Sequence, residues 1–343
     1  MNESLKRAGY RLALYSIFGV FIPLIFVWSL LIIHFTFGAV NIFFDLIYTG
    51  LTVYFFFFMK DVIKSVRYFC IVSLVISIWY LFIPASNNRE WQDDVKLLPK
   101  IVQTGSEITI ENFRNFSYKD GKPLDMNYET RSYNLDDLEG TDMIISYWDG
   151  YRTIGHTFIC FRFKGGKSFA VSLEVRKEKG ESYSPAKGLF KQYELIYVFG
   201  DEKDLIPLRT KHRGEETFLY PMTLTLEQSK TFLLGIMDAA NDLHTNPKFY
   251  HSLNMNCTTT LIKHLNKVKE FKIPVLTKFI LNGITDYIAY EMKGIPTDIP
   301  FDILKRCCYI SRIANDIPLN DDYPIELRKQ INERLSQERN NLK

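Results

Sequence analysis

One cysteine of the chain stands where a helix is expected to begin. In the stretch NMNCTTTLIKHL at 254–265, Asn256 is a favoured helix N-cap and apolar residues follow at helical spacing. Cys257 then lies in the first turn, near the positive end of the helix dipole and unpaired backbone N–H groups, which favour a thiolate. Taken alone, the segment favours a small buried thiol without chemistry, the usual state of a free cysteine.

A thiolate nucleophile needs a neighbouring base, and His156 in the motif GHTF is the best-placed histidine. It is expected in the middle of a strand, surrounded by apolar residues, although a strand histidine can also be a satisfied core residue. His264 follows Cys257 by about two helical turns, roughly 10 Å along the axis, and cannot bond the thiol. The remaining histidines are expected in a membrane segment, in a charged loop and near helix ends: His34, His212, His244 and His251.

The base in turn needs a group that orients it, and Glu174 on the next strand is the expected one. The run SFAVSLEVR at 168–176 alternates apolar and polar residues, and its polar row includes Ser172 and Glu174. A turn of three or five residues between the strands would place His156 and Glu174 on one face, whereas two or four would separate them. The assignment therefore depends on the register of the hairpin.

Other assignments of these polar residues remain open. Asp142 and Ser172 are the alternatives for orienting the histidine. Glu174 could instead form an ion pair with Arg176 or Arg162.

The elements around these residues predict an α+β domain. A capping box from Thr225 to Gln228 begins a helix that runs to about His244. An antiparallel sheet followed by packed helices is typical of this class. The segment 208–221 fits either a hairpin or an irregular loop. Strand-like runs occur at 108–118, 141–148, 151–163, 168–176 and 193–200. Further helices are expected at 275–292, 301–314 and 325–337, before a frayed polar end.

The first part of the chain is dominated by apolar segments at 12–33, 40–59 and 68–83, which predict three membrane-spanning helices. Basic residues precede the first segment and separate the second from the third, whereas the connection 34–39 has no Lys or Arg. This asymmetry predicts a cytoplasmic N-terminus and an outward-facing remainder. A cleaved signal peptide does not fit, because the first segment is too long and lacks a small-residue cleavage site. Asp45, within the second segment, is either functional or close to an interface.

The composition therefore divides the chain of 343 residues into two parts. We expect a membrane domain at 1–83 and an extracytoplasmic domain at 84–343, with its core at about 85–265 and C-terminal helices at 270–343. The polar stretch 84–94 is expected to leave the membrane with Trp91 near the interface.

The charge and the cysteines argue against several classes of function. The net charge is +3, without the basic stripe of a nucleic-acid-binding protein. The cysteines show neither a disulfide framework nor a metal-ligand spacing, so we expect no metal and no cofactor. They are Cys70, Cys160, Cys257, Cys307 and Cys308.

Six motifs occur in order along about 85–265: RNFSY, GHTF, SLEVRKEKGESYS, GLFKQYELIYVFGDEKDLIPLRT, LYP and NPKFYHSLNMNCTT. Together they resemble the Lnb family of bacterial lipoprotein N-acyltransferases, which is built on the Lnb N-terminal periplasmic domain. In that family many members carry membrane helices after the catalytic domain, whereas here they precede it. The order of histidine and cysteine is also similar, in arrangement only, to permuted papain-like acyltransferases of the lecithin:retinol acyltransferase type.

The resemblance implies that His156 and Cys257 are the catalytic pair. The thiolate would take an acyl chain from a membrane phospholipid as a thioester and pass it to the N-terminal diacylglyceryl-cysteine of a lipoprotein. Asn256 would cap the helix and help to shape the oxyanion site. The partners implied are a phospholipid, a diacylated lipoprotein and the bacterial inner membrane, with the catalytic domain on the periplasmic face.

Two other functions are compatible with the sequence. A thiol peptidase or amidase acting on cell-envelope peptides would use the same dyad, and an open polar groove at Cys257 would favour it. In a non-catalytic, membrane-tethered binding module, Cys257 and His156 would only pack.

Overall fold

The structure is a computed structural model that describes residues 17–119, 122–148, 150, 152, 154–268, 273 and 282–342. The chain divides into two compact units. The helical unit comprises Met1–Ala85 and Ser184–Gln192, and the sheet unit comprises Ser86–Tyr183 and Tyr193–Lys343. The segment Ser184–Gln192 therefore belongs to a different unit from the residues on either side of it.

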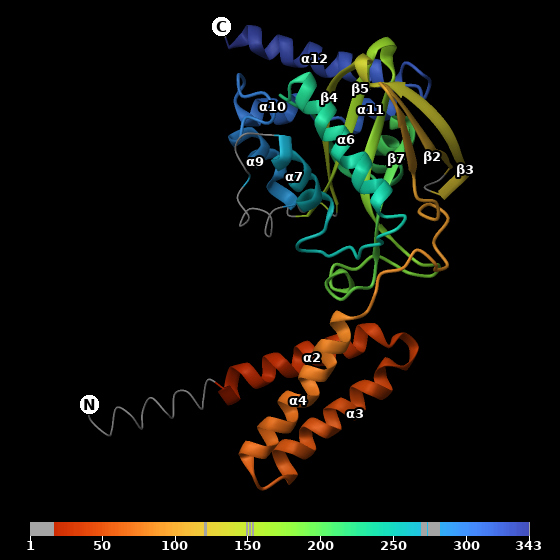
Figure 1. The fold of residues 1–343 in the computed structure, drawn as a ribbon. Coiled ribbons are helices and arrows are strands. Elements are labelled where there is room, and N and C mark those ends of the chain that lie inside the picture. The colour runs from red at the N-terminus through yellow and green to blue at the C-terminus, as the bar shows by residue number, and fades with distance from the viewer. Residues whose placement is uncertain are drawn as a thin grey trace. The chain divides into compact units, whose positions relative to one another are not determined.

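The helical unit contains three helices long and apolar enough to cross a membrane: Phe18–Thr36, Asn41–Phe58 and Val62–Leu81. Their α-helical parts are α2 (Ile22–Thr36), α3 (Asn41–Val53) and α4 (Val62–Leu81) (Figure 1). The third helix begins before the predicted position because Asp61 caps it, accepting hydrogen bonds from the backbone N–H groups of Ile63 and Lys64. Lys64 and Arg67 consequently lie on the helix, not in a loop.

A polar clasp joins α2 to α3. His34 Nδ1 lies 2.8 Å from Asp45 Oδ2, and the Asn41 amide donates a hydrogen bond of 3.1 Å to the carbonyl of His34. The acidic residue of the second apolar segment is therefore paired with the histidine of the first, across a short connection. Such pairing is the usual way in which a membrane segment accommodates a charge.

The segment Ser184–Gln192 packs on α2 and α4 within the helical unit. The ring of Phe190 stacks on that of Phe35 with centroids 5.0 Å apart. The ammonium of Lys191 donates to the carbonyls of Tyr80, Leu81 and Ile83 at the end of α4, at 2.8 to 3.1 Å. Both a buried aromatic ring and a capped helix end thus attach this segment to the apolar helices.

The sheet unit is built on an eight-stranded sheet of order β1-β2-β7-β6-β5-β4-β8, with β3 paired to β2. Only β2 and β7 pair in parallel, and all other pairs are antiparallel. With the helices that follow, this confirms the α+β class. The sequence missed β1 and β3, and part of the segment 208–221 is a strand. The strands are β1 (Lys100–Thr104), β2 (Glu107–Lys119), β3 (Lys122–Asn134), β4 (Leu138–Tyr147), β5 (Gly155–Phe163), β6 (Ser168–Arg176), β7 (Glu194–Gly200) and β8 (Glu216–Pro221).

The turn between β5 and β6 sets the register of the hairpin. Arg162 pairs with Ser168, so five residues lie between the last paired positions. Gly165 and Gly166 adopt φ values of 72° and 75°, a left-handed conformation that favours glycine. Because the loop is odd-numbered, positions 156 and 174 fall on the same face.

Helices cover both faces of the sheet. On one face lie α6 (Leu226–Asp242) and α7 (Cys257–Val268), with Phe232 of α6 packed against Phe161 of β5 (Figure 1). The predicted capping box of α6 is present, with Thr225 and Gln228 bonding each other's backbone N–H. The opposite face carries α5 (Glu202–Pro207), α11 (Ser311–Asp316) and α12 (Tyr323–Asn341), which contact one another.

The later helices differ in detail from the prediction. The expected helix at 301–314 is broken into α10 (Phe301–Cys307) and α11. The expected frayed end is helical, since α12 continues to Asn341. Of the expected helix at 275–292, the described part contains α9 (Thr285–Glu291), and 274–281 lie outside the described residues.

Trp91 is a buried part of the sheet unit, contrary to the expectation of an interfacial residue. Its side chain is 7% exposed, and its indole N–H donates to the carbonyl of Asn87 at 2.9 Å. The guanidinium of Arg176 lies 4.4 Å from the ring centroid. The cation–π contact helps to hold the tryptophan inside the sheet unit.

A buried ionic clasp fixes α12 to the sheet. Arg328 donates to Asp142 of β4 at 2.7 Å and, through two bonds of 2.8 Å, to Glu202 of α5. Both carboxylates are almost fully buried. An uncompensated charge there would be costly, so the C-terminal helix and the sheet depend on the same guanidinium.

Arg328→Met is expected to lower the free energy of unfolding by about 3–5 kcal/mol, because Glu202 would remain buried without its cationic partner. The matched variant is Arg339→Met, at another arginine of α12. It breaks a half-exposed pair with Asp298 and should lower the free energy of unfolding by at most about 1 kcal/mol. Urea denaturation of the full chain in detergent, followed by tryptophan fluorescence, measures both. Equal losses in the two variants would contradict the importance of the clasp.

Candidate active site

Cys257 is the first residue of α7, as its sequence context predicts. The helix starts there because Asn256 Oδ1 accepts from the backbone N–H of Thr259 at 2.8 Å, while Thr259 Oγ1 accepts from that of Asn256 at 3.0 Å. The Asn256 amide also donates to the carbonyl of Ser252 at 2.7 Å. Asn256 is therefore held on both sides, and the thiol, 5% exposed, occupies a fixed position at the helix start.

His156, Ser172 and Glu174 form a hydrogen-bonded chain on one face of the β5–β6 hairpin. Ser172 Oγ donates to Glu174 Oε1 at 2.7 Å and lies 2.7 Å from His156 Nε2. Nε2 is also 3.1 Å from Glu174 Oε1. Because the hydroxyl proton is directed to the carboxylate, Nε2 must be the donor to Ser172. In the neutral ring the lone pair is then on Nδ1, which leaves that atom as the base.

Cys257 and His156 line the same cavity, and each stabilises the charged form of the other. Burial raises the pKa of Cys257, but the charge and hydrogen bond of His156, with further bonds from the Thr157 backbone and the Thr258 hydroxyl, lower it below its usual value. Burial and Arg209 lower the pKa of His156, but Glu174 and Cys257 outweigh them and raise it to about 9. The two shifts therefore both favour an imidazolium–thiolate pair.

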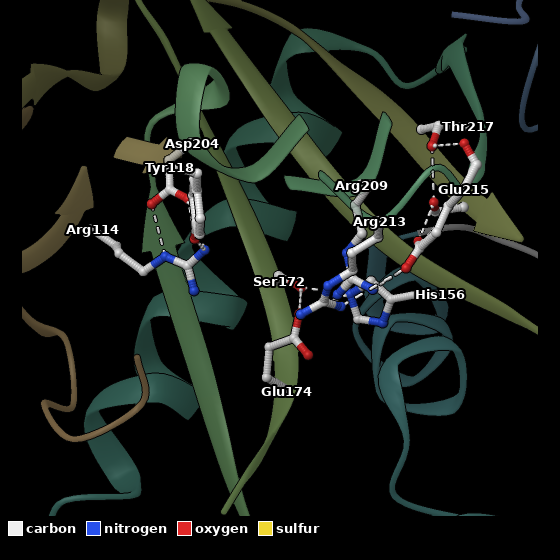
Figure 2. A network of polar contacts seen from close by, with 11 residues as sticks. Arg114, Tyr118, His156, Ser172, Glu174, Asp204, Arg209, Arg213, Glu215 and Thr217 are labelled. Atoms are coloured by element: carbon white, nitrogen blue, oxygen red, sulfur yellow. Dashed lines mark hydrogen bonds and ion pairs between the residues drawn. The ribbon is translucent and has the colours of Figure 1, made fainter. Parts of the chain in front are cut away.

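Arg209 bridges two half-buried carboxylates of the site, those of Glu174 and Glu215, as Figure 2 shows. Its guanidinium donates to Glu174 Oε1 at 2.9 Å and lies 3.4 Å from Glu215 Oε1. Burial raises the pKa of Glu174, but His156 and Arg209 hold it well below its usual range. Glu215 in turn accepts from Ser146. The guanidinium of Arg209 thus helps to keep the carboxylate of Glu174 ionised.

Cys257 and His156 line one cavity of 360 Å³, together with Glu174, Arg209 and Arg213. A second part of its wall is aromatic, where the hydroxyls of Tyr183 and Tyr250 lie 3.5 Å apart. The remainder includes aliphatic side chains: Val95, Ile154, Leu173, Val175 and Leu208. A polar reacting centre therefore opens into a partly apolar space, as is common in small-molecule sites.

Asp142, the other acid considered for orienting the histidine, and Arg176, a possible ion-pair partner of Glu174, both bind other groups. Asp142 pairs with Arg328 and Arg162 on the sheet, and Arg176 donates to Asn87 and to nearby backbone carbonyls. Ser172, the other alternative for orienting the histidine, stands between His156 and Glu174 as part of the same chain of bonds.

The remaining histidines of the sheet unit lie in other surroundings. His264 Nε2 is 3.0 Å from the hydroxyl of Tyr197, and burial lowers its pKa to about 4. His212, expected in solvent, is half-buried with its ring 5.1 Å from that of Tyr118. His244 Nε2 lies 2.9 Å from the carbonyl of Pro99.

Sequence reasoning missed Arg209 and Glu215. Both come from the segment 208–221, which was predicted as a hairpin or loop and is a helical turn, Leu208–His212, followed by β8. The signal available was the charge pattern of RTKHRGEE. It did not show that Arg209, unlike the exposed Lys211 and Arg213, turns inward to 5% exposure.

The site is a thiol site without a metal cluster in the part of the chain that the structure describes. No group of three or more His, Cys, Asp and Glu side chains there could hold a metal ion. Cys257 is a free thiol.

Residues 125–283 match the family model of the Lnb N-terminal periplasmic domain. The chain carries an Lnb domain. His156, Glu174 and Cys257 all fall within the matched residues. No curated protein and no solved structure matches the chain.

The matched domain and the three apolar helices together indicate a membrane protein with a periplasmic domain. The matched residues overlap the resemblance expected at about 85–265 and begin after the membrane segments. The similarity in arrangement to permuted papain-like enzymes stays a prediction.

Glu174→Gln is expected to slow the alkylation of Cys257 by iodoacetamide at pH about 6. Without the carboxylate charge the pKa of His156 falls from about 9, the imidazolium is lost at lower pH, and the pKa of Cys257 rises. Each unit of that rise reduces the thiolate about tenfold below the pKa. Mass spectrometry of the labelled Cys257 peptide across a pH series measures the shift. Glu111→Gln, on an exposed pair with Lys100, is the control, and superimposable profiles for all three proteins would contradict the assignment.

Proposed function

We propose that this Lnb-family protein is a thiol-dependent acyltransferase that moves an acyl chain from a membrane phospholipid to the N-terminal diacylglyceryl-cysteine of a lipoprotein. The observation that carries the proposal is that Cys257, whose pKa is lowered by His156, lines the same partly apolar cavity as that histidine. The Glu174 carboxylate orients the base, which completes the arrangement that an activated thiol requires.

In the first step, the thiolate of Cys257 attacks the ester carbonyl of the phospholipid. The carbon–oxygen bond breaks, the proton of the imidazolium passes to the leaving oxygen, and a lysophospholipid departs. The acyl chain remains on Cys257 as a thioester, and His156 is left neutral with its Nδ1 lone pair available.

In the second step, the α-amine of the lipoprotein cysteine attacks the thioester. His156 accepts the amine proton, the carbon–sulfur bond breaks, and the imidazolium–thiolate pair is restored. An amide replaces the thioester, so the reaction needs no cofactor and no external energy source. The thioester is activated toward amines, which favours transfer over a direct exchange between ester and amine.

The start of α7 is suited to stabilise the oxyanion of both steps. Helix N-termini present unpaired backbone N–H groups and a positive dipole. The side chain of Asn256 takes up the N–H of Thr259, and its own amide is committed to Ser252. Backbone donors near Cys257, positioned by the Asn256 cap, would therefore form the oxyanion site.

The membrane arrangement supports a lipid substrate. We propose a membrane domain at 1–83 with the N-terminus in the cytoplasm, and a catalytic domain at 84–343 on the periplasmic side of the bacterial inner membrane. Both substrates are anchored in the outer leaflet of that membrane, so a tethered enzyme meets them in two dimensions. The aliphatic part of the cavity wall favours an acyl chain over a cell-wall peptide, the substrate of the alternative thiol peptidase.

Cells that lack other N-acyltransferases should gain N-acylated lipoproteins when this chain is expressed. Cys257→Ala is expected to reduce the N-acylated fraction below detection, because no thioester can form. Mass spectrometry of lipoprotein N-termini measures the result.

The matched control for this experiment is Cys160→Ala, which removes a buried thiol from the same sheet without touching the cavity. Cys160→Ala should acylate normally at equal expression. If Cys257→Ala still produces N-acylated lipoproteins, the nucleophile assignment is wrong. If the unmodified chain produces none, the acyltransferase proposal is wrong.

The rate of acylation of Cys257 by phospholipid should decline as pH rises through about 9. His156 loses its proton there, and that proton is needed by the leaving oxygen. A decline is also expected on the acid side, once the thiolate of Cys257 is protonated. Single-turnover measurements of the acyl-enzyme by intact mass test this profile, and a rate still rising above pH 10 would contradict it.

A further inference from the structure

The cavity beside Cys257 contains hydrogen-bond donors that have no acceptor among the residues the structure describes. The indole Nε1 of Trp148 is buried without a partner. Lys177, half-buried in the same wall, forms no ion pair or side-chain hydrogen bond with another described residue. The nearest carboxylate to Arg213 is Glu215, 3.9 Å from Nη1, which is too far for a hydrogen bond. Donors left in this state favour a ligand that is rich in acceptors.

The charges on the wall favour an anionic ligand. Figure 2 shows Arg209 and Arg213 side by side next to Glu215. Arg209 is bound by both Glu174 and Glu215, so these carboxylates are already engaged by another guanidinium. The charge of Arg209, together with burial, lowers the pKa of Arg213, which reflects two cations held close together. Asp94 is the remaining acid of the wall and forms no ion pair with a described residue.

We propose that Arg213 and Lys177 bind the phosphate of the phospholipid donor while its ester reaches Cys257. This inference rests on the proposed acyl transfer and assigns the residues that recognise the donor. The planar guanidinium matches two phosphate oxygens at once, and the ammonium adds a point charge.

The geometry of the cavity agrees with this division of the substrate. The side chain of Arg213 is 45% exposed, so a phosphate there keeps part of its hydration, whereas Cys257 and His156 are buried. The volume of 360 Å³ is near the lower end of ligand pockets, which span about 300–1,000 Å³. It suits a headgroup, its ester linkage and the part of the acyl chain next to the ester, which would lie against the aliphatic wall. The N–H of Trp148 then offers a further donor to the oxygens of the bound lipid.

The test compares two donors that carry the same acyl esters and differ in the phosphate. The full chain in detergent is incubated with micelles of dioleoyl phosphatidylglycerol or of dioleoylglycerol, and acyl-Cys257 is followed by intact mass. The parent protein should prefer the phospholipid by about tenfold or more, the usual scale of a charge-assisted contact. Arg213→Gln and Lys177→Gln should each reduce that ratio at least severalfold, and Arg213→Lys should restore part of it. Arg312→Gln, an exposed arginine on α11, is the matched control.

The outcomes separate this inference from the acyltransferase proposal. An unchanged donor ratio in both Arg213→Gln and Lys177→Gln overturns the phosphate site while leaving acyl transfer intact. Equal loss of both donors in Arg213→Gln, with a normal fold, also overturns it, because the residue would then act through Arg209 and Glu215. Failure of the parent protein to form acyl-Cys257 from either donor counts against the acyltransferase proposal itself.

Discussion

The ionised carboxylate of Glu174 is the interaction on which the candidate site depends. It is half-buried, and burial alone raises its pKa. The guanidinium of Arg209 supplies the compensating positive charge, and Ser172 and His156 donate hydrogen bonds to the same carboxylate. The histidine is therefore fixed in one tautomer and held next to the thiol. The same contacts keep the carboxylate charge satisfied and leave Nδ1 of His156 as the base.

Much of the site could be predicted because its signals are local. The cap at Asn256 and the apolar stripe after it locate the start of α7 without knowledge of the rest of the chain. The alternation in SFAVSLEVR fixes which residues of β6 share a face, and only the length of the β5–β6 turn remained undecided. With five residues between Arg162 and Ser168, the pairing of His156 with Glu174 follows from geometry.

The rest could not be predicted because it depends on contacts between segments far apart in the chain. Arg209 lies in the charged run RTKHRGEE, and its local sequence does not distinguish it from the other basic residues there. It is buried because it packs against β6, where it donates to Glu174. Trp91 was expected near the membrane interface, but it is buried in the sheet unit, where its ring contacts Arg176, a residue far from it in the sequence. The same reason applies to β1 and β3, which lie at the edge of the sheet and carry weak alternation.

Arg209 also limits how far the pKa of His156 is raised. Glu174 and Cys257 raise the pKa of His156, whereas Arg209 opposes them. The first step of the proposed reaction needs a protonated ring to release the leaving oxygen, but the second needs a neutral ring to accept a proton from the amine. Once the thioester forms, the negative charge of Cys257 disappears, and one of the two influences that raise the pKa of His156 is gone. Arg209 remains, so the pKa falls just when the ring must become a base. The same guanidinium that keeps Glu174 ionised thereby suits the site to both half-reactions.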